Sequence, residues 1–273
     1  MTLNCNGKIL DLKIPKVMGI LNLAPDSFFD GGKYHSIELA TKRCCEMLTQ
    51  GADIIDIGAA SSRPGAKIIS QKEEFNRLIP ILKVLVKKFD SAIFSVDTFR
   101  SQIAKASLDE GVSVINDITA GEFDARMLPL VGKYNGVYIA MHMQGLPHNM
   151  QKNPNYKNIT SEILTFFLNK IESCRLNNIS DIIIDPGFGF GKKINQNFTI
   201  LKNLEIFQEL NVPILVGFSR KSMIYKSLNI ESADALNGTS VLNTIALMKK
   251  ANILRVHDVK EAKESIELCR KLF

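Results

Sequence analysis

The chain has 273 residues, of which 45% are hydrophobic and 23% are charged, and its formal net charge is +6. This length is typical of α/β barrels that form one domain, and this composition excludes a disordered chain. The Lys and Arg residues are spread along the chain and alternate with acids, so the sequence predicts no nucleic-acid partner and favours phosphate-bearing small molecules.

The five cysteines are odd in number and form no C-x-x-C pair, so neither a disulfide framework nor a zinc site is predicted. The first residues lack the apolar core of a signal peptide, and no later run approaches the ~20 apolar residues of a membrane span. We therefore expect a cytoplasmic protein with no membrane partner.

Short apolar runs rich in Val and Ile alternate with longer segments of helical period, which is the pattern of a parallel sheet built from βα units. The predicted strands are 16–21, 53–58, 92–97, 113–118, 136–143, 181–186, 212–218 and 252–257. The predicted helices are 36–51, 72–89, 101–111, 123–134, 161–178, 196–210, 233–250 and 259–272.

Eight strands, each followed by a helix, predict a TIM (β/α)8 barrel that forms a single domain over residues 1–273. A doubly wound open sheet is the alternative. It is disfavoured because no G-x-G-x-x-G motif follows the first predicted strand.

In a TIM barrel the active-site groups lie where the strands end. Nearly every predicted strand ends in a polar or charged group: Asn22, residues 59–66, Asp97, Asn116 with Asp117, residues 141–144, Asp185 with PGFGFGK, residues 217–221, and Arg255 with His257. Any single one of these is commonly a turn former or a helix cap. Together they predict a polar recognition set, because desolvating them without a ligand is costly.

Two sets of side chains suggest two kinds of ligand group. Asp97, Asn116 and Asp185 suit a flat heterocycle that presents several N–H donors. The cationic residues are Arg63, Arg220, Lys221, Arg255 and His257. They suggest a polyanion, although Arg220 could also serve only to cap its own loop.

The glycines of DPGFGFGK (185–192) let the backbone approach a ligand closely. Phe188 and Phe190 in this segment offer faces for stacking, and the alternative is that these rings pack only within the loop.

Seven motifs follow one another along the chain: NLAPDSFFDGG, SSRPGA, FSVDT, INDI, DPGFGFGK, GFSRK and RVHD. In order and spacing, from about Val17 to Asp258, they resemble the signatures of the dihydropteroate synthase family. The resemblance implies a transferase of folate biosynthesis that joins (7,8-dihydropterin-6-yl)methyl diphosphate to 4-aminobenzoate, with Mg²⁺ as cofactor and pyrophosphate as the second product. It also suggests a homodimer through helices near the C-terminus.

The resemblance assigns roles by matching position. It implies metal contact for Asn22 and a catalytic role for Asp97, Asp185, Lys221, Arg255 and His257. It places pterin diphosphate against Ser62, Arg63, Asp97, Asn116, Met141, Asp185, Phe190, Gly217, Lys221, Arg255 and His257. It places 4-aminobenzoate against Phe28, Pro64, Phe190, Lys221 and Ser222.

The loop NLAPDSFFDGG (22–32) is expected to close over the charged substrate, with Gly31 and Gly32 as a flexible segment and Phe28 as an apolar wall. Four residues depart from the family pattern: Ala24, Phe29, Ala60 and Ser62. These departures bear on sulfonamide affinity more than on the reaction.

Two alternatives share the pterin-binding barrel. A methyltransferase that uses methyltetrahydrofolate would keep the acidic and amide positions but has no diphosphate to bind. A non-catalytic pterin-binding paralogue would be favoured by the loss of Arg63, Asp185 or Lys221, and all three are present.

Overall fold

The computed structural model describes residues 1–23, 37–60, 68–145, 150 and 154–272. Its centre is an eight-stranded parallel sheet in the order β8-β7-β6-β5-β4-β3-β10-β9. The strands are β3 (Lys16–Asn22), β4 (Ile54–Gly58), β5 (Ile93–Asp97), β6 (Val114–Asp117), β7 (Val137–Met141), β8 (Ile182–Asp185), β9 (Leu215–Val216) and β10 (Ile253–Val256). A parallel bridge between Ile184 and Ile214 brings the two edges together, so the sheet is nearly closed and the predicted TIM barrel is confirmed.

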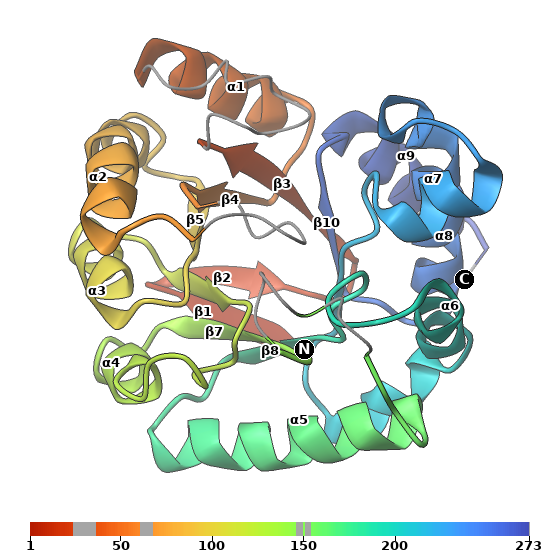
Figure 1. Ribbon diagram of the computed structural model, residues 1–273. Helices are drawn as coiled ribbons and strands as arrows, with labels where there is room; N and C mark the ends of the chain where they lie inside the picture. Colours follow the sequence, from red (N-terminus) through yellow and green to blue (C-terminus); the bar gives the residue numbers. More distant parts are fainter. Residues whose placement is uncertain (24–36, 61–67, 146–149, 151–153, 273) are drawn as a thin grey trace.

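Helices surround this sheet (Figure 1). They are α1 (Ile37–Thr49), α2 (Gln71–Lys88), α3 (Ser101–Asp109), α4 (Met127–Lys133), α5 (Ile159–Leu176), α6 (Ile194–Lys202), α7 (Ser222–Leu228), α8 (Leu236–Met248) and α9 (Val259–Cys269), with 3-10 turns at Leu204–Leu210 and Ser232–Asp234. Local signals set several boundaries: for example, the Ser70 hydroxyl accepts the N–H of Glu73 at the start of α2. Within the described part of the chain, no helix is both long and apolar enough to span a membrane.

Two elements were not predicted from the sequence. The first is a hairpin of β1 (Thr2–Cys5) and β2 (Lys8–Asp11), whose two-residue turn places Asn6 at φ 54° and Gly7 at φ 83°. Asn-Gly is the pair that such a turn favours, so the signal was present. The second is α7, which begins where a loop was expected to continue.

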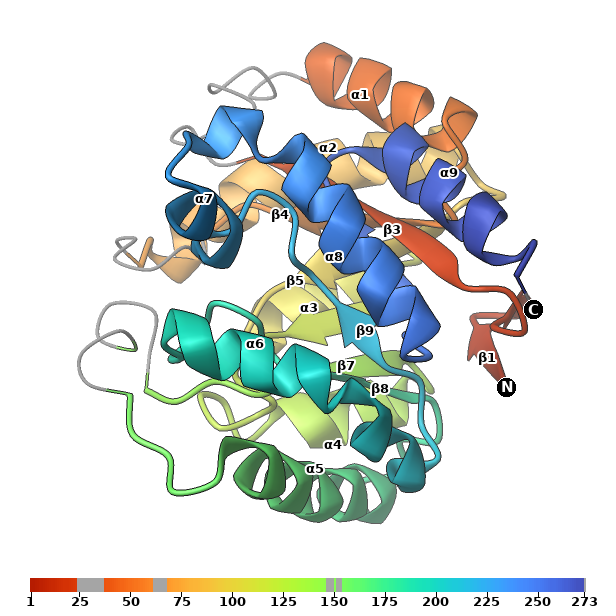
Figure 2. The same cartoon turned by 90° about the vertical axis from the view of Figure 1, so that its right-hand side faces the viewer.

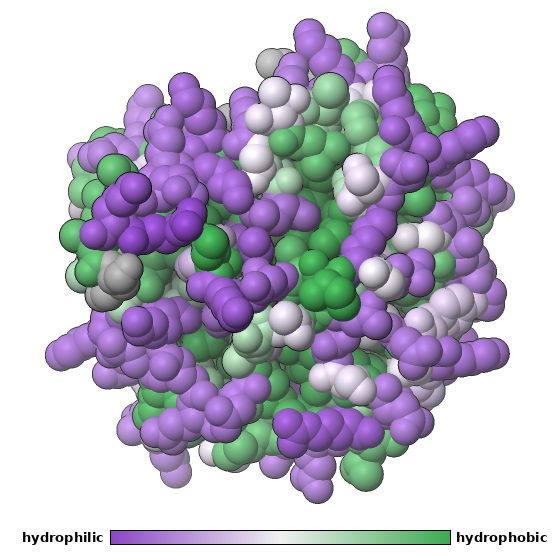
Figure 3. Space-filling model, turned by 180° about the vertical axis from the view of Figure 1, so that it is seen from behind, coloured by the Kyte–Doolittle hydropathy of each residue, from purple (hydrophilic) through white to green (hydrophobic). Residues whose placement is uncertain are grey.

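The barrel interior is layered. An apolar layer joins the hairpin residues Leu3, Cys5 and Leu10 to strand residues such as Met18 and Ile54. The hairpin therefore covers the amino-terminal end of the barrel, and Figure 3 shows this face covered by hydrophilic and hydrophobic side chains together. Both termini lie at this end and α7 lies at the other (Figure 2). Residues that alternate with the inward ones pack against the helices.

Helix α4 packs directly on the end of α5. A Cβ atom on Gly132 would lie 1.7 Å from the backbone oxygen of Asn177, whereas one on Gly238 in α8 would lie 2.4 Å from the Cγ2 methyl group of the Ile224 side chain. We expect Gly132→Ala to lower the free energy of unfolding by ~1–3 kcal/mol, and Gly238→Ala to cost less because a side chain can move aside. Urea unfolding measures both, and equal losses would contradict the expectation.

Candidate active site

Strand register brings the predicted polar residues to one end of the barrel. Asn22, Gly58, Asp97 and Asn116 lie side by side on β3, β4, β5 and β6. Met141 on β7 lies beside Asp185 on β8 in the same way. Residues far apart in the chain therefore form one layer, directly above the apolar interior.

A buried ion-pair network occupies this layer. Arg255 donates from Nε to Asp56 Oδ2 at 2.7 Å and from Nη2 to Asp97 Oδ2 at 2.9 Å. The amide of Asn116 donates from Nδ2 to Asp56 Oδ2 at 3.0 Å. The Asp56 side chain is fully buried. One guanidinium thus links the carboxylates of two strands.

Asp56 is the site residue that sequence reasoning missed. Its signal was a charged residue between Ile55 and Ile57, inside an otherwise apolar strand. Its Oδ1 atom is buried and makes no hydrogen bond within the described residues. Because Asp56 can only accept from the Asn116 Nδ2 group, the Asn116 amide is oriented, and its Oδ1 atom is left as an acceptor.

Burial raises the pKa of Asp97 to about 7, against an ordinary value of 3.8. The Arg255 charge opposes this rise, while the carboxylates of Asp56, Glu74 and Asp117 add to it. Asp97 is therefore a carboxyl group that changes its charge near neutral pH.

Asp185 and Lys221 form a second charged pair. Asp185 Oδ1 accepts the N–H of Gly187 at 2.7 Å. Burial raises the pKa of Asp185, and the Lys221 charge opposes that shift. Burial likewise lowers the pKa of Lys221 to about 8, with Asp185 acting in the opposite direction. Each charge is thus stabilised by the other in a desolvated site.

Lys221 is held against the loop that follows β8. Its Nζ atom donates to the Phe188 carbonyl oxygen at 2.6 Å and lies 4.7 Å from the centre of the Phe190 ring. Gly189, at φ +84°, leaves room for this side chain, since a Cβ atom there would lie 3.3 Å from Lys221 Cδ. The glycine therefore permits a close approach of lysine and loop.

Apolar residues border the charged groups. Phe190 and Met141 belong to one cluster with Phe99, Ile118 and Met150. Phe188 instead lies fully buried, with its ring centre 4.4 Å from that of Phe218. Packing within the fold therefore accounts for Phe188, while Phe190 remains beside the charged layer.

Three polar residues of the strand ends have structural partners. Arg220 pairs with Asp258 at 2.9 Å and also binds the Ala233 carbonyl group, which agrees with its loop-capping alternative. Asp117 accepts from Thr119, Gly121 and the Tyr138 hydroxyl. His257 Nδ1 lies 2.9 Å from Ser219 Oγ.

The two predicted sets of charged residues are connected through Arg255. Arg255 was grouped with the cations of an anion site, but its guanidinium pairs with Asp56 and with Asp97, a member of the acidic set. The reason is that Arg255 points into the barrel in the layer that holds these carboxylates. Gly217 borders the same place, since a Cβ atom there would lie 3.7 Å from Lys221 Nζ and 3.8 Å from Arg255 Cβ.

Some predicted residues are not placed. Phe28, Ser62, Arg63 and Pro64 lie outside the described residues, as do Ala24, Phe29 and the loop 24–32. Ser222 is described as the half-buried first residue of α7, and Ala60 is half-buried after β4. Among the residues that are described, no group of three His, Cys, Asp or Glu side chains could hold a metal ion.

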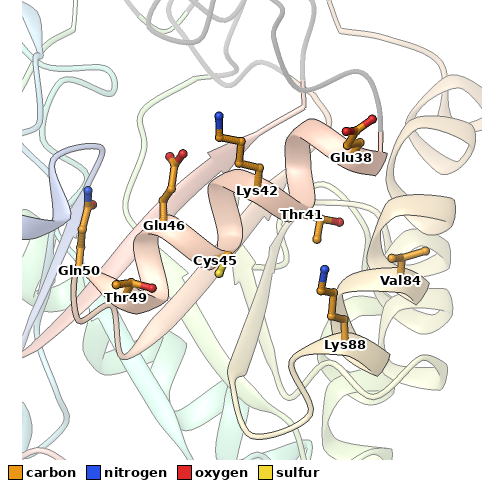
Figure 4. Close-up of a pocket in the computed structure, with 9 residues that line it drawn as sticks. All are labelled: Glu38, Thr41, Lys42, Cys45, Glu46, Thr49, Gln50, Val84 and Lys88. Atoms are coloured by element: carbon orange, nitrogen blue, oxygen red, sulfur yellow. The ribbon is translucent and has the colours of Figure 1, made fainter.

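A surface pocket of about 720 Å³ lies elsewhere, between α1 and α2 (Figure 4). Its lining residues are Glu38, Thr41, Lys42, Cys45, Glu46, Thr49, Gln50, Val84 and Lys88. None of the predicted site residues lines it. The charged layer at the strand ends, with its shifted pKa values, is therefore the stronger candidate for chemistry.

Comparison with known proteins gives consistent matches. The chain matches the family of pterin binding enzymes over residues 18–257. It is 40% identical to the dihydropteroate synthase of Escherichia coli strain K12, over 98% of this chain and 95% of that protein. The Yersinia pestis dihydropteroate synthase with a sulfonamide drug is 39% identical, with a TM-score of 0.96 over 100% of this chain and 99% of that one. The Xanthomonas albilineans dihydropteroate synthase with 4-aminobenzoic acid is 34% identical, with a TM-score of 0.92 over 99% and 97% of the two chains.

The raised pKa of Asp97 predicts a pH-dependent stability. Between 3.8 and about 7 the folded protein keeps the Asp97 proton and the unfolded chain releases it, so this group makes the wild type less stable as pH rises through that window. In Asp97→Asn this contribution is absent. We expect the free energy of unfolding of Asp97→Asn to rise relative to wild type across the window, measured by urea unfolding. A difference that does not change with pH would contradict the assignment.

Proposed function

Because the chain belongs to the dihydropteroate synthase family, we propose that its charged layer binds the pterin of (7,8-dihydropterin-6-yl)methyl diphosphate. The protein is a transferase of folate biosynthesis, and it condenses this substrate with 4-aminobenzoate to give 7,8-dihydropteroate and pyrophosphate. In this proposal one group of residues recognises the pterin ring, and another group stabilises the charges of the reaction.

The observation that carries the proposal is the buried set of acceptors at one end of the barrel. The Asp97 and Asp185 carboxylates and the oriented Oδ1 of Asn116 come from adjacent or nearby strands. The pterin ring presents a row of N–H donors, and a carboxylate accepts such bonds strongly in a desolvated site. Met141 and Phe190 supply the apolar surface that a flat ring needs.

Lys221 and Arg255 supply the positive charge of the site. Both lie beside the acidic groups, so their charges oppose the rise that burial causes in the pKa of Asp185, and Arg255 also opposes the rise in the pKa of Asp97. In this proposal Arg255 and His257 lie toward the diphosphate side, and Ser62 and Arg63 complete that side.

At the diphosphate side of the site, the described residues would hold Mg²⁺ mainly through the phosphates of the substrate. Mg²⁺ is commonly held by one or two protein oxygens together with substrate phosphates and waters. Asn22 offers one amide oxygen at the end of β3, in line with Asp97 and Asn116. We propose Asn22 as that ligand, and the metal would neutralise charge on the diphosphate.

The aminobenzoate is assigned to the outer part of the site, near Phe190, Lys221 and Ser222, with Phe28 and Pro64. The Xanthomonas relative with 4-aminobenzoic acid and the Yersinia relative with a sulfonamide drug support this choice of second substrate and of inhibitor class. The neutral aromatic amine is already nucleophilic. The protein therefore acts mainly by holding the amine in line with the pterin methylene group and by stabilising charge on the leaving pyrophosphate.

The direct test is an assay of pyrophosphate release with both substrates, repeated with each substrate omitted. The proposed reaction requires both, because condensation consumes the amine together with the pterin diphosphate. Release without 4-aminobenzoate at the full rate would show hydrolysis in place of condensation. Binding of a pterin without any release would favour a non-catalytic pterin-binding protein.

We expect Asp185→Asn to weaken pterin binding by roughly 10- to 150-fold, because a charge-assisted acceptor contributes ~1.5–3 kcal/mol. Titration calorimetry with a pterin measures this change. Asp117→Asn is the matched control, since Asp117 is equally buried but bonds only to Thr119, Gly121 and Tyr138 among the described residues. Unchanged affinity in a folded Asp185→Asn variant would show a structural role alone.

We also propose that the protein is a homodimer through α8. Val241, Ile245 and Met248 are 50%, 36% and 49% exposed, and their spacing places them on one side of this helix. Helix α8 lies on the outside of the barrel (Figure 2). Such an apolar stripe suits a partner surface.

For this interface we expect Val241→Glu to convert dimers to monomers in light scattering, because a charge would be buried at the contact. Leu168→Glu is the control, since Leu168 is 55% exposed on α5. A wild type that is monomeric at micromolar concentration would refute the proposal.

A cytoplasmic location also remains a proposal. It is supported by the described cysteines, Cys5, Cys44, Cys45, Cys174 and Cys269, all of which are free thiols. Free thiols persist in a reducing compartment.

A further inference from the structure

Lys192 is a buried cation that has no part in the proposed reaction. It is the last residue of DPGFGFGK, and it is only 3% exposed. Its Nζ atom donates to the carbonyl oxygens of His142 at 3.0 Å, Gly187 at 2.9 Å and Phe190 at 2.9 Å. An ammonium group has three N–H donors, so each donor has one acceptor.

These three acceptors come from two different loops. His142 follows β7, whereas Gly187 and Phe190 belong to the loop after β8. The two loops touch through their backbones: a Cβ atom on Gly187 would lie 2.1 Å from His142 O, and one on Gly191 would lie 2.5 Å from Gln144 O. Lys192 therefore lies where the β7 and β8 loops meet.

Groups of the pterin site depend on this junction. The β8 loop carries Phe190, the Phe188 carbonyl that holds Lys221, and the Gly187 N–H that binds Asp185. If the loops separated, these three contacts would change together. One lysine is thus connected by the backbone to both the apolar and the charged parts of the site.

Lys192 also acts on Asp185 by its charge. The Asp185 carboxylate faces positive charge from Lys221, Arg255 and Lys192. Burial lowers the pKa of Lys192 to about 7, and Asp185 opposes this shift. His142 adds no charge near neutrality, because burial lowers its pKa to about 2. Lys192 is therefore charged mainly on the acid side of neutrality.

We propose that Lys192 is a positioning residue, which joins the β7 and β8 loops and supplies a counter-charge to Asp185 for pterin binding. It touches neither substrate, and its effect reaches the ligand through Asp185, Phe190 and Lys221. The proposal rests on the proposed pterin site.

The experiment compares wild type with Lys192→Met, Lys192→Arg and Lys170→Met. Lys170 is the matched control, because it is a buried lysine on α5 that pairs with Glu122 outside the barrel. Each protein is titrated calorimetrically with 6-hydroxymethylpterin and, separately, with pyrophosphate and Mg²⁺, on the acid and on the alkaline side of neutrality. Circular dichroism first establishes that each variant is folded.

We expect Lys192→Met to bind the pterin roughly 10-fold or more weakly, because the loss of charge-assisted hydrogen bonds at the junction is large enough for a change of that size. The loss should be larger on the acid side, since the charge of Lys192 is present there and absent at higher pH. Pyrophosphate affinity should be nearly unchanged. Lys192→Arg should recover most of the acid-side affinity because it keeps the charge, and Lys170→Met should behave as wild type.

Several results would overturn the inference while leaving the proposed function intact. A folded Lys192→Met variant with wild-type pterin affinity would show that the junction does not support the site. An equal loss at both pH values that Lys192→Arg does not recover would show a packing role only. If Lys192→Met does not fold, Lys192→Arg is the variant that tests the proposal. A loss of pterin affinity in Lys192→Arg that is as large on the acid side as on the alkaline side would refute the counter-charge. A wild type that binds neither ligand would contradict the proposed function itself, and with it this inference.

Discussion

The arrangement depends on one guanidinium placed among carboxylates inside the barrel. Arg255 reaches Asp56 on β4 and Asp97 on β5, while Asp56 also fixes the amide of Asn116 on β6. Buried carboxylates without a partner would be too costly to keep charged. The Arg255 guanidinium therefore stabilises the buried polar layer, and in the proposed function this layer determines which ligand binds.

The fold makes room for this layer by separating two functions along the barrel axis. At the amino-terminal end the hairpin and residues such as Met18 and Ile54 form a dry apolar layer. At the other end the same strands present Asp56, Asp97, Asn116, Asp185 and Arg255. The parallel register sets this division, because each strand that crosses the apolar layer ends at the polar one.

Sequence patterns were sufficient for the architecture and for most of the described site. The strand ends that carry Asp97, Asn116, Asp185 and Arg255 were predicted because β strands alternate with helices and their last residues are polar. The helix expected over 196–210 proved to be α6 followed by a 3-10 turn, and β9 is much shorter than the predicted 212–218. These errors in the element boundaries arise because the period of hydrophobic residues does not determine where the backbone hydrogen bonds of a helix or strand end.

Partners in space could not be read from the sequence. Asp56 looked like part of a buried strand, and the neighbouring sequence does not indicate that its partner is Arg255, which lies 199 residues away. Lys192 looked like the end of a glycine-rich motif, and its three acceptors are revealed only where the β7 and β8 loops meet. Conversely, Asp117 lies near the end of a predicted strand and Arg220 lies just after one, yet both bond within the protein.

Pterin recognition by the charged layer requires that Asp97, whose pKa burial raises to about 7, becomes ionised to accept the N–H groups of the ring. Calorimetric titration of the pterin near neutral pH, in two buffers with different enthalpies of ionisation, counts the protons exchanged on binding. We expect a net release of protons in wild type that is reduced in Asp97→Asn. The same binding enthalpy in both buffers for wild type would mean that no proton is exchanged, and would contradict this role of Asp97.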